Sequence, residues 1–426
     1  MKNKKLERWR PCQSYCQMNG AAAAVLSFKN ANVVFNGPRW CSVIAERELM
    51  SYDRTLTERL YCSHIEQSDL LFGTGERIRD IIEDQNRENP ETSLLAILTS
   101  CSVGLIGDDV NGIVNSIEQT YPILVLDAGG LTGLFEEGYQ TAMIEILKKL
   151  HLEKSSSVIS GRVNLLGYCN YYPNSNGDLR ELKRLLRMAG FEVGVCPGES
   201  GLDLQELKKL PTASLNIVLS SELGLGMAKY LKDIIGQEYV VLPVPYGIEQ
   251  TMEWIRNISK TLSVIPNMAK LEKDAQIMLE NVTEQVDMLK RTVSNLTYRR
   301  AILALPYSQA KSLAKALQNE ILEVEKIKFE LQGNFGVDES FDNDETVEEK
   351  PWLSSDYQLL FGSAADRARI QEFARTIYIN MHKKDSRIQR KLMTFAGIEG
   401  WGMLIQNIID QTLTLHHMKE GEYRND

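Results

Sequence analysis

Three cysteines share one local context, and they are the residues best placed to do chemistry. Cys16 precedes a helix rich in small residues, Cys41 opens the next predicted helix, and Cys101 ends a buried strand just before another helix. At the N-terminus of a helix, unpaired N–H groups and the positive end of the dipole stabilise a thiolate or an anionic cluster. Iron–sulfur clusters require thiolates in such surroundings. The pattern therefore indicates an iron–sulfur site.

The spacing of these cysteines restricts the kind of site. Cys16 and Cys41 are 25 residues apart, and Cys41 and Cys101 are 60 apart, so the three thiols have to converge from separate loops at one edge of a sheet. Neighbouring glycines that would let the backbone approach the sulfides are Gly20, Gly37 and Gly104. Three thiolates are one short of the usual four, which indicates that a second subunit completes the site. The alternative is three ordinary buried thiols, and spacing by itself favours that alternative.

The remaining cysteines offer a weaker alternative. Cys12 and Cys16 form a C-x3-C pair, which would be half of a zinc site if Cys62 and His64 were the other half. Because Cys62 and His64 are only two residues apart, their spacing suits a tetrahedral site poorly. Seven cysteines spread over a long chain also do not predict a disulfide framework, so we expect reduced thiols.

Several familiar chemistries are excluded by missing motifs. No Gly-x4-Gly-Lys-Ser/Thr loop is present, so we expect no nucleotide in this chain and any ATP to be used by a partner. The segment Gly224-Leu-Gly226-Met-Ala-Lys229 lacks the third glycine of a dinucleotide fingerprint, and we interpret it as a strand-to-helix turn. Neither a G-x-S-x-G elbow nor an H-E-x-x-H motif occurs.

Composition narrows the class of protein. The chain has 426 residues, enough for two or three domains, and is 43% hydrophobic and 25% charged. Its net charge of −9, from 57 acidic and 48 basic residues, argues against nucleic acid or anionic lipid as a partner. No stretch approaches the roughly 20 apolar residues of a membrane helix, and the polar segment 11–19 interrupts any signal peptide. We expect a cytoplasmic protein without a membrane partner.

Strand-length apolar runs alternate with helical patterns along the chain, which predicts the α/β class with parallel sheets flanked by helices. The strands are predicted at 31–35, 94–99 and 123–126, then at 158–166, 192–195, 216–220 and 240–243, and last at 301–305 and 357–361. The helices are predicted at 20–28, 42–51, 77–86 and 138–150, then at 178–189, 226–235 and 247–262, and last at 268–299, 308–320 and 364–376.

These elements form three similar modules. The predicted domains are 1–157 with the cysteine-bearing segments, 158–265, and 266–426 with the long helix. Within the third domain, residues 333–350 carry seven acidic residues against one basic and no aliphatic cluster, which predicts a solvated linker or a mobile flap.

Three segments resemble, in order, the cluster-ligand segments of nitrogenase component 1 proteins. They are Cys16-Gln-Met-Asn-Gly20-Ala, Asn36-Gly37-Pro38-Arg39-Trp40-Cys41 and Thr99-Ser-Cys101-Ser-Val-Gly-Leu-Ile-Gly107-Asp108-Asp109. Further matching segments lie at 69–73, 163–167, 177–179, 359–363, 397–400 and 404–409. Ordered matches over essentially the whole chain are far more specific than any one motif, and they reverse the preference for ordinary buried thiols.

The resemblance implies a fold, a cofactor and partners. It implies three Rossmann-like domains and an iron–sulfur cluster whose iron is bound by Cys16, Cys41 and Cys101 and shared with a partner subunit. That partner would be a homologous α-type subunit, or a second copy of this chain, in a dimer or a heterotetramer. Electrons would come from a separate homodimeric, ATP-dependent iron–sulfur reductase. The 25-residue interval between Cys16 and Cys41 and the ending at 397–413 resemble the β-type chain more than the α-type chain.

Two departures from the family pattern bear on the cofactors. The α-type chain of nitrogenase holds its active-site cofactor through a Cys and a His, but Ser220 stands at the matching Cys position and 387–395 contains no His. In addition, Leu134 replaces a β-type Ser that can ligate the oxidised eight-iron cluster. The resemblance therefore implies either a four-iron cluster (4Fe-4S) or a P-cluster-like eight-iron cluster (8Fe-7S) that lacks this ligand.

We therefore expect a subunit of a nitrogenase-like reductase, an oxidoreductase active only in complex, that relays low-potential electrons to a substrate at or near a partner subunit. Tetrapyrroles, small thioethers and dinitrogen-like molecules are candidate substrates by family analogy, and the sequence does not choose among them. A contrasting hypothesis is a non-catalytic scaffold subunit for metal-cofactor assembly. A third is a binding subunit without a cluster.

Overall fold

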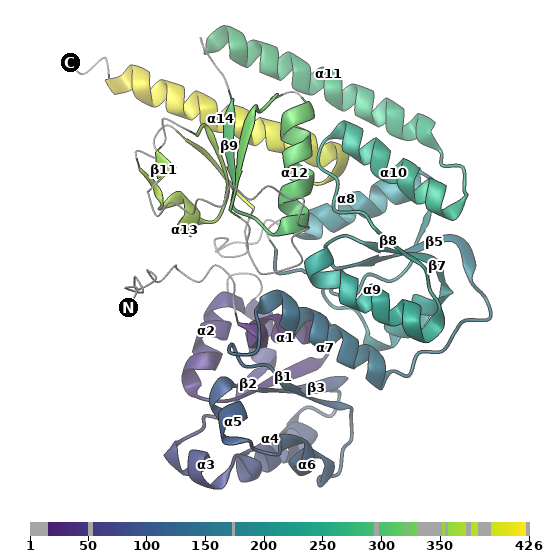
Figure 1. Ribbon diagram of the computed structural model, residues 1–426, viewed down its shortest axis with the longest axis vertical. Coiled ribbons are helices and arrows are strands. Elements are labelled where there is room, and N and C mark those ends of the chain that lie inside the picture. Colours follow the sequence, from purple (N-terminus) through teal and green to yellow (C-terminus); the bar gives the residue numbers. More distant parts are fainter. Residues whose placement is uncertain are drawn as a thin grey trace, which may run out of the picture.

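The computed structural model describes residues 16–49, 54–172, 175–293, 298–320, 322–330, 352–353, 357–371, 376–381 and 393–422. Within these ranges the chain forms three four-stranded sheets, all of whose paired strands are parallel, together with one two-stranded pair (Figure 1). The predicted α/β fold with three Rossmann-like units is confirmed. Cys12 and the acidic segment 333–350 lie outside the described residues.

The first sheet has the order β2-β1-β3-β4. Its strands are β1 (Ala31–Asn36), β2 (Leu60–Cys62), β3 (Leu94–Thr99) and β4 (Ile123–Asp127). Its helices are α1 (Gln17–Leu26), α2 (Arg39–Leu49), α3 (Gln67–Phe72), α4 (Gly75–Glu88), α5 (Cys101–Ile106), α6 (Val110–Asn115) and α7 (Phe135–Lys149), with a 3-10 turn at Arg54–Arg59.

Both faces of this sheet are covered, which explains why β3 is apolar from Leu94 to Leu98. Alternate side chains of a strand point to opposite faces. Leu94 and Leu98 pack in one core with α1 and α7, whereas Leu95 and Ile97 pack in a second core with α4 and α6. Helices on both faces leave the carboxyl edge of the sheet as the place where its loops gather.

The second sheet has the order β6-β5-β7-β8. Its strands are β5 (Ile159–Leu166), β6 (Glu192–Val193), β7 (Ala213–Val218) and β8 (Tyr239–Val241), and its helices are α8 (Ser175–Met188), α9 (Ser221–Ile235) and α10 (Ile248–Leu262), with a 3-10 segment at Leu204–Thr212. Helix α7 packs against both α1 and α9, so one hydrophobic core joins the first two units.

The third sheet has the order β10-β9-β12-β14. Its strands are β9 (Arg300–Leu303), β10 (Lys326–Phe329), β12 (Leu359–Gly362) and β14 (Ile377–Asn380), and the small pair is β11 (Trp352–Leu353) with β13 (Ile370–Gln371). Its helices are α11 (Met268–Thr292), α12 (Tyr307–Asn319), α13 (Ala364–Arg367) and α14 (Gly397–Glu422). The long helices α11 and α14 lie side by side at the top of Figure 1. In the described ranges, no helix is long and apolar enough to cross a membrane.

The structure corrects three predicted elements. The helix predicted at 364–376 is wrong, because among the described residues of that range α13 alone is helical and residues 370–371 pair with β11 instead. The long helix ends at Thr292 rather than at 299. The turn predicted at 224–229 lies inside α9, where a Cβ at Gly224 would stand 2.6 Å from the backbone nitrogen of Gly167. Gly224 therefore allows α9 to pack closely on the end of β5.

Candidate cluster site

The three cysteines singled out from the sequence lie at one edge of the first sheet. Cys16 is the N-cap of α1, Cys41 is in the first turn of α2, and Cys101 is the first residue of α5. Helices α2 and α5 directly follow the carboxyl ends of β1 and β3, which pair side by side in the sheet. All three thiols are partly buried and none forms a disulfide. The structure thus brings together the residues that the sequence predicted to converge.

A bare stretch of backbone after β4 lies against two of these thiols. A Cβ added at Gly129 would stand 3.0 Å from the backbone nitrogen of Cys101 and 3.1 Å from its Sγ. A Cβ added at Gly130 would stand 2.9 Å from the Cβ of Cys16 and 4.0 Å from the Sγ of Cys101. Cys16 and Cys101 therefore lie against the same pair of glycines, where side chains would fill the space beside the sulfurs.

Cys41 lies close enough to Cys16 and Cys101 for their charges to influence its pKa. Burial raises the pKa of Cys41 to about 11, and the neighbouring thiols of Cys16, Cys101 and Cys62 contribute to the rise. Burial also raises the pKa of Cys16, although hydrogen bonds from backbone N–H groups at the start of α1 oppose the effect. In the free protein Cys16 and Cys41 therefore keep their protons, and metal binding would release them.

Close packing of α1 on α7 fixes the position of Cys16. A Cβ at Gly20 would lie 1.8 Å from the carbonyl oxygen of Phe135, and one at Gly138 would lie 1.9 Å from the carbonyl oxygen of Gln17. The backbone N–H of Gln17 also donates to the carbonyl of Gly133 at 3.1 Å. Because the crossing tolerates no larger residue, the first turn of α1 is held firmly beside the loop that follows β4.

Leu134 stands where the resemblance implies an additional serine ligand. It is the N-cap of α7, and its backbone forms an antiparallel bridge with Cys16. The position is therefore adjacent to the thiols, but its side chain is a hydrocarbon without a donor atom. The geometry agrees with a site that has only thiolates to offer from this chain.

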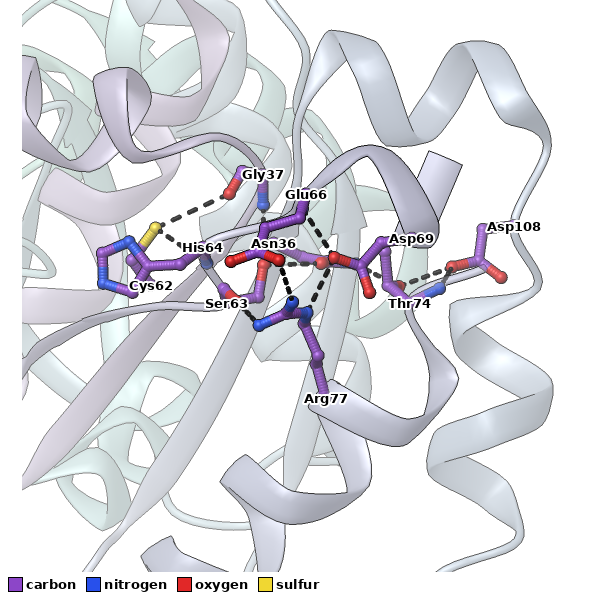
Figure 2. Close-up of polar contacts among 10 residues, drawn as sticks. All are labelled: Asn36, Gly37, Cys62, Ser63, His64, Glu66, Asp69, Thr74, Arg77 and Asp108. Atoms are coloured by element: carbon purple, nitrogen blue, oxygen red, sulfur yellow. Dashed lines mark hydrogen bonds and ion pairs between the residues drawn. The ribbon is translucent and has the colours of Figure 1, made fainter. Parts of the chain in front are cut away.

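A network of hydrogen bonds holds the turn before Cys41, as Figure 2 shows. Asn36 Nδ2 donates to Thr74 Oγ1 at 3.0 Å, and Asn36 Oδ1 accepts a hydrogen bond of 3.0 Å from Ser63 Oγ. The N–H of Gly37 donates to Ser63 Oγ at 3.0 Å. The N–H of Thr74 donates to Asp108 Oδ2 at 2.7 Å. These buried and partly buried polar groups satisfy one another and make the turn rigid.

The same network joins two of the thiol-bearing segments. Asn36 leads directly into the turn that ends at Cys41, and Asp108 follows the helix that begins at Cys101. A further backbone hydrogen bond of 2.9 Å runs from the N–H of Ser100 to the carbonyl of Asn36. Movement of one segment would therefore strain the other.

Cys62 lies near Cys41 but is held by backbone groups. Its Sγ donates to the carbonyl of Gly37 at 3.6 Å and accepts from the N–H of His64 at 3.4 Å. Across the described part of the chain, no group of three or more His, Cys, Asp and Glu side chains is arranged to hold a metal ion, and the zinc alternative also requires Cys12, which lies outside the described residues. A cluster of several irons bridged by sulfide is bound by thiolates that need not meet at one point.

Several exposed apolar side chains lie near the three thiols in the chain or on neighbouring elements. Trp40 next to Cys41 is 74% exposed, Leu131 after the two glycines is 74% exposed, and Leu105 in α5 is 77% exposed. Leu71 and Phe72 of nearby α3 are also exposed. Exposed large apolar side chains are typical of a surface that another protein covers when they form a continuous patch.

The residues present fit an iron–sulfur cluster. Three thiols supply the donor type that iron–sulfur clusters use, two glycines leave room beside them, and the apolar rim would exclude water once a partner covers it. That Gly129 and Gly130 lie beside the thiols was not predicted from the sequence. Two adjacent glycines shortly after a buried strand could have indicated it. The glycines named instead pack elements together: the nearest neighbour of Gly37 is Ser100, and that of Gly104 is Asp127.

Comparison with known proteins defines the class. A model of the nitrogenase component 1 type oxidoreductase family matches residues 16–329. The chain belongs to this family, whose members include oxidoreductase subunits. The structure of "Nitrogenase Cp1 at pH 6.5" superimposes with a TM-score of 0.72 and 17% identity, over 97% of this chain and 95% of that one.

The curated relatives match this chain over only part of their own length. The chain is 26% identical over 249 residues to a subunit of light-independent protochlorophyllide reductase from Chlorobium phaeobacteroides (strain BS1), which covers 58% of this chain and 46% of the relative. It is 24% identical over 296 residues to the nitrogenase iron-iron protein beta chain of Rhodobacter capsulatus, and this match covers 63% of this chain and 62% of the relative. The matched region thus spans about half to three-fifths of these relatives.

Proposed function

We propose that the chain is a subunit of a nitrogenase-like reductase and relays low-potential electrons through an iron–sulfur cluster at a subunit interface. One observation carries the proposal: Cys16 and Cys101 lie against the same bare backbone at Gly129 and Gly130, and Cys41 lies within electrostatic reach of both. When bound, the cluster supplies one-electron transfer. The substrate lies at or near a partner subunit.

The chain's own residues bind, orient and shield the group. Cys16, Cys41 and Cys101 would bind iron as thiolates. Asn36 and Asp108, through the network described above, hold two of these thiols in place. The exposed apolar rim around Trp40 and its neighbours is where a partner would exclude water.

The partners follow from what this chain lacks. Three thiolates are one short of the usual four, so a homologous α-type subunit, or a second copy of this chain, supplies the remaining ligand. The family resemblance implies a separate homodimeric iron–sulfur reductase that uses ATP, and no phosphate-binding loop is present in the sequence of this chain. With Leu134 beside Cys16, the cluster is a four-iron cluster or an eight-iron cluster without a serine ligand.

Electron transfer in a reconstituted mixture tests this function. The chain is purified without oxygen, both alone and co-expressed with a homologous α-type subunit, and each preparation is mixed with the reduced ATP-dependent reductase. We expect reduction of the cluster, followed by absorption and electron paramagnetic resonance, only when reductase and ATP are both present. A cluster that stays oxidised in the complete mixture would contradict the relay and favour a scaffold for cofactor assembly.

A further inference from the structure

Two serine hydroxyls flank Cys101, and the proposed function gives neither of them a role. Ser100 directly precedes α5, and Ser102 follows Cys101 in the first turn of that helix. Ser100 Oγ and Ser102 Oγ lie 3.0 Å apart, which is a hydrogen-bond distance. The side chains on either side of a proposed iron ligand are therefore joined to each other.

Ser100 departs from the usual behaviour of a serine in its position. It is the N-cap of α5, where a serine hydroxyl commonly accepts a hydrogen bond from an N–H group of the first helical turn. Among the described residues, no N–H of that turn donates to the hydroxyl of Ser100. Its partner is the hydroxyl of Ser102 instead. The side chain of Ser100 thus contacts Ser102 rather than capping the helix.

Backbone hydrogen bonds and close packing fix the position of this pair. The N–H of Ser100 donates to the carbonyl of Asn36 at 2.9 Å, and its carbonyl accepts from the N–H of Gly104 at 2.9 Å. A Cβ added at Gly37 would stand 2.5 Å from both the Cβ and the Oγ of Ser100. The hydroxyl of Ser100 therefore packs on the bare Cα of Gly37, at the start of the turn that leads to Cys41.

Burial decides which of the two hydroxyls donates. Ser100 is 1% exposed, and a buried hydroxyl whose proton has no acceptor costs free energy. The hydroxyl of Ser100 therefore donates to Ser102 Oγ, which lies within reach of it. Ser102 is partly exposed, so its own proton remains available. A hydroxyl that accepts a hydrogen bond is also a stronger donor, because linked hydrogen bonds polarise one another.

We propose that the hydroxyl of Ser102 donates a hydrogen bond to a sulfur atom on the iron that Cys101 binds and so raises the reduction potential of the cluster, and that Ser100 is the positioning residue that orients this hydroxyl. The inference rests on the proposed function, because it requires a cluster bound by Cys101. Hydrogen bonds to the sulfurs are among the factors that set cluster potentials. Reduction makes the sulfurs more negative, and a hydrogen bond to a more negative acceptor is stronger.

The reduction potential of the cluster tests the role of Ser102. Wild-type protein, Ser102→Ala and Ser102→Thr, each co-expressed with a homologous α-type subunit, are purified without oxygen and titrated with detection by electron paramagnetic resonance. We expect Ser102→Ala to retain its iron. At the wild-type midpoint potential, its ratio of reduced to oxidised cluster should be about tenfold lower, which is a shift of about 59 mV for one electron. Ser102→Thr keeps the hydroxyl and should stay close to the wild-type potential.

A double-variant cycle tests whether Ser100 acts through Ser102. Ser100→Ala should lower the potential by less than Ser102→Ala does, because the hydroxyl of Ser102 is still present but is no longer oriented. Ser100→Ala combined with Ser102→Ala should have the same potential as Ser102→Ala alone, since no hydroxyl is left to orient. Shifts that add in the double variant would overturn the positioning role.

Ser93→Ala is the matched control, because the hydroxyl of Ser93 donates to the carbonyl of Lys29 at the opposite end of β3. Its potential should equal that of the wild-type protein. An unchanged potential in Ser102→Ala, an equal shift in Ser93→Ala, or a potential in Ser102→Thr as low as in Ser102→Ala would overturn the proposal.

Iron content separates this inference from the proposed function. Loss of iron with Ser102→Ala would show that Ser102 is an iron ligand rather than a donor, and would overturn the proposal. A wild-type protein without a cluster would overturn the proposed function together with this inference. A wild-type cluster whose potential does not respond to Ser102→Ala would overturn this inference alone.

Discussion

Gly130 presents its bare Cα to Cys16, so closely that a Cβ at position 130 would stand 2.9 Å from the Cβ of Cys16. Real side chains do not approach to this distance, so the cysteine would have to move. The glycine is therefore a requirement for the position of the thiol and not only for the turn after β4.

The first prediction follows from this contact. Gly130→Val should lower the iron bound per chain by at least about half, because a ligand displaced by around an ångström no longer meets the cluster. Iron analysis after anaerobic purification measures the effect. Gly75→Ala is a matched control, since its Cβ would meet only the side chain of Ile113 at 3.2 Å. Full iron content in Gly130→Val would show that the loop does not shape the site.

A second prediction concerns the cysteines outside the ligand set. Cys62→Ala should leave the visible absorption of the cluster largely unchanged, because the sulfur of Cys62 is engaged with Gly37 and His64. The same result is expected for Cys12→Ala, on the sequence pattern alone. A colourless protein in either case would revive a site completed within one chain.

Stability of the α8, α11 and α14 junction gives a third prediction. Glu181 has a fully buried side chain, and Arg184 donates to it at 2.6 and 2.8 Å while also pairing with Asp274. Arg184→Met would leave the buried carboxylate without its cation, which costs about 3 kcal/mol of unfolding free energy. Urea denaturation of Arg184→Met should show this loss. The control Arg87→Met should change the unfolding free energy by at most about 0.5 kcal/mol, because its ion pair with Asp84 is exposed. Similar effects in both variants would refute the argument.

Glu320 gives a fourth prediction, on pH. It accepts hydrogen bonds from the N–H groups of Ile248 and Glu249, and burial raises its pKa from 4.5 to about 7. Because the folded state holds this proton more tightly than the unfolded chain, the stability that it contributes is present below pH 4.5 and is lost as the pH rises through about 7.

Melting curves of the wild-type protein and Glu320→Gln test the linkage. The difference between their melting temperatures should change by about 2 °C over this pH range, with the wild-type protein losing more as pH rises. Glu206→Gln, at an exposed pair with Lys209, should follow the wild-type protein. Parallel pH profiles for wild-type and Glu320→Gln would contradict the prediction.

Much of the fold could be predicted from the sequence because buried parallel strands are locally distinctive. The apolar run 94–99 is β3 to the residue. Elements decided by distant contacts were not predictable in this way. Gly224 reads as a turn residue locally, yet it lies inside α9 because β5 approaches it. Residues 370–371 have a helical pattern and become a strand because β11 is available to pair with them.

The arrangement of the thiols was predictable for a geometric reason. Loops that follow parallel strands gather at one edge, so Cys41 after β1 and Cys101 after β3 had to be neighbours once those strands paired. The contact of Gly130 with Cys16 was not predictable from the sequence, because it depends on β4 lying next to β3. The link from Asn36 to Asp108 spans 72 residues of sequence and has no local pattern.

Iron content of single cysteine variants tests the central claim most directly. Wild-type protein and the variants Cys16→Ala, Cys41→Ala, Cys101→Ala, Cys169→Ala and Cys196→Ala are purified without oxygen, and iron and the electron paramagnetic resonance signal are measured for each. The account predicts depleted iron and an altered signal in the first three, and wild-type values in the last two, because Cys169 and Cys196 are buried in the second unit. Equal iron content in all five variants would contradict it.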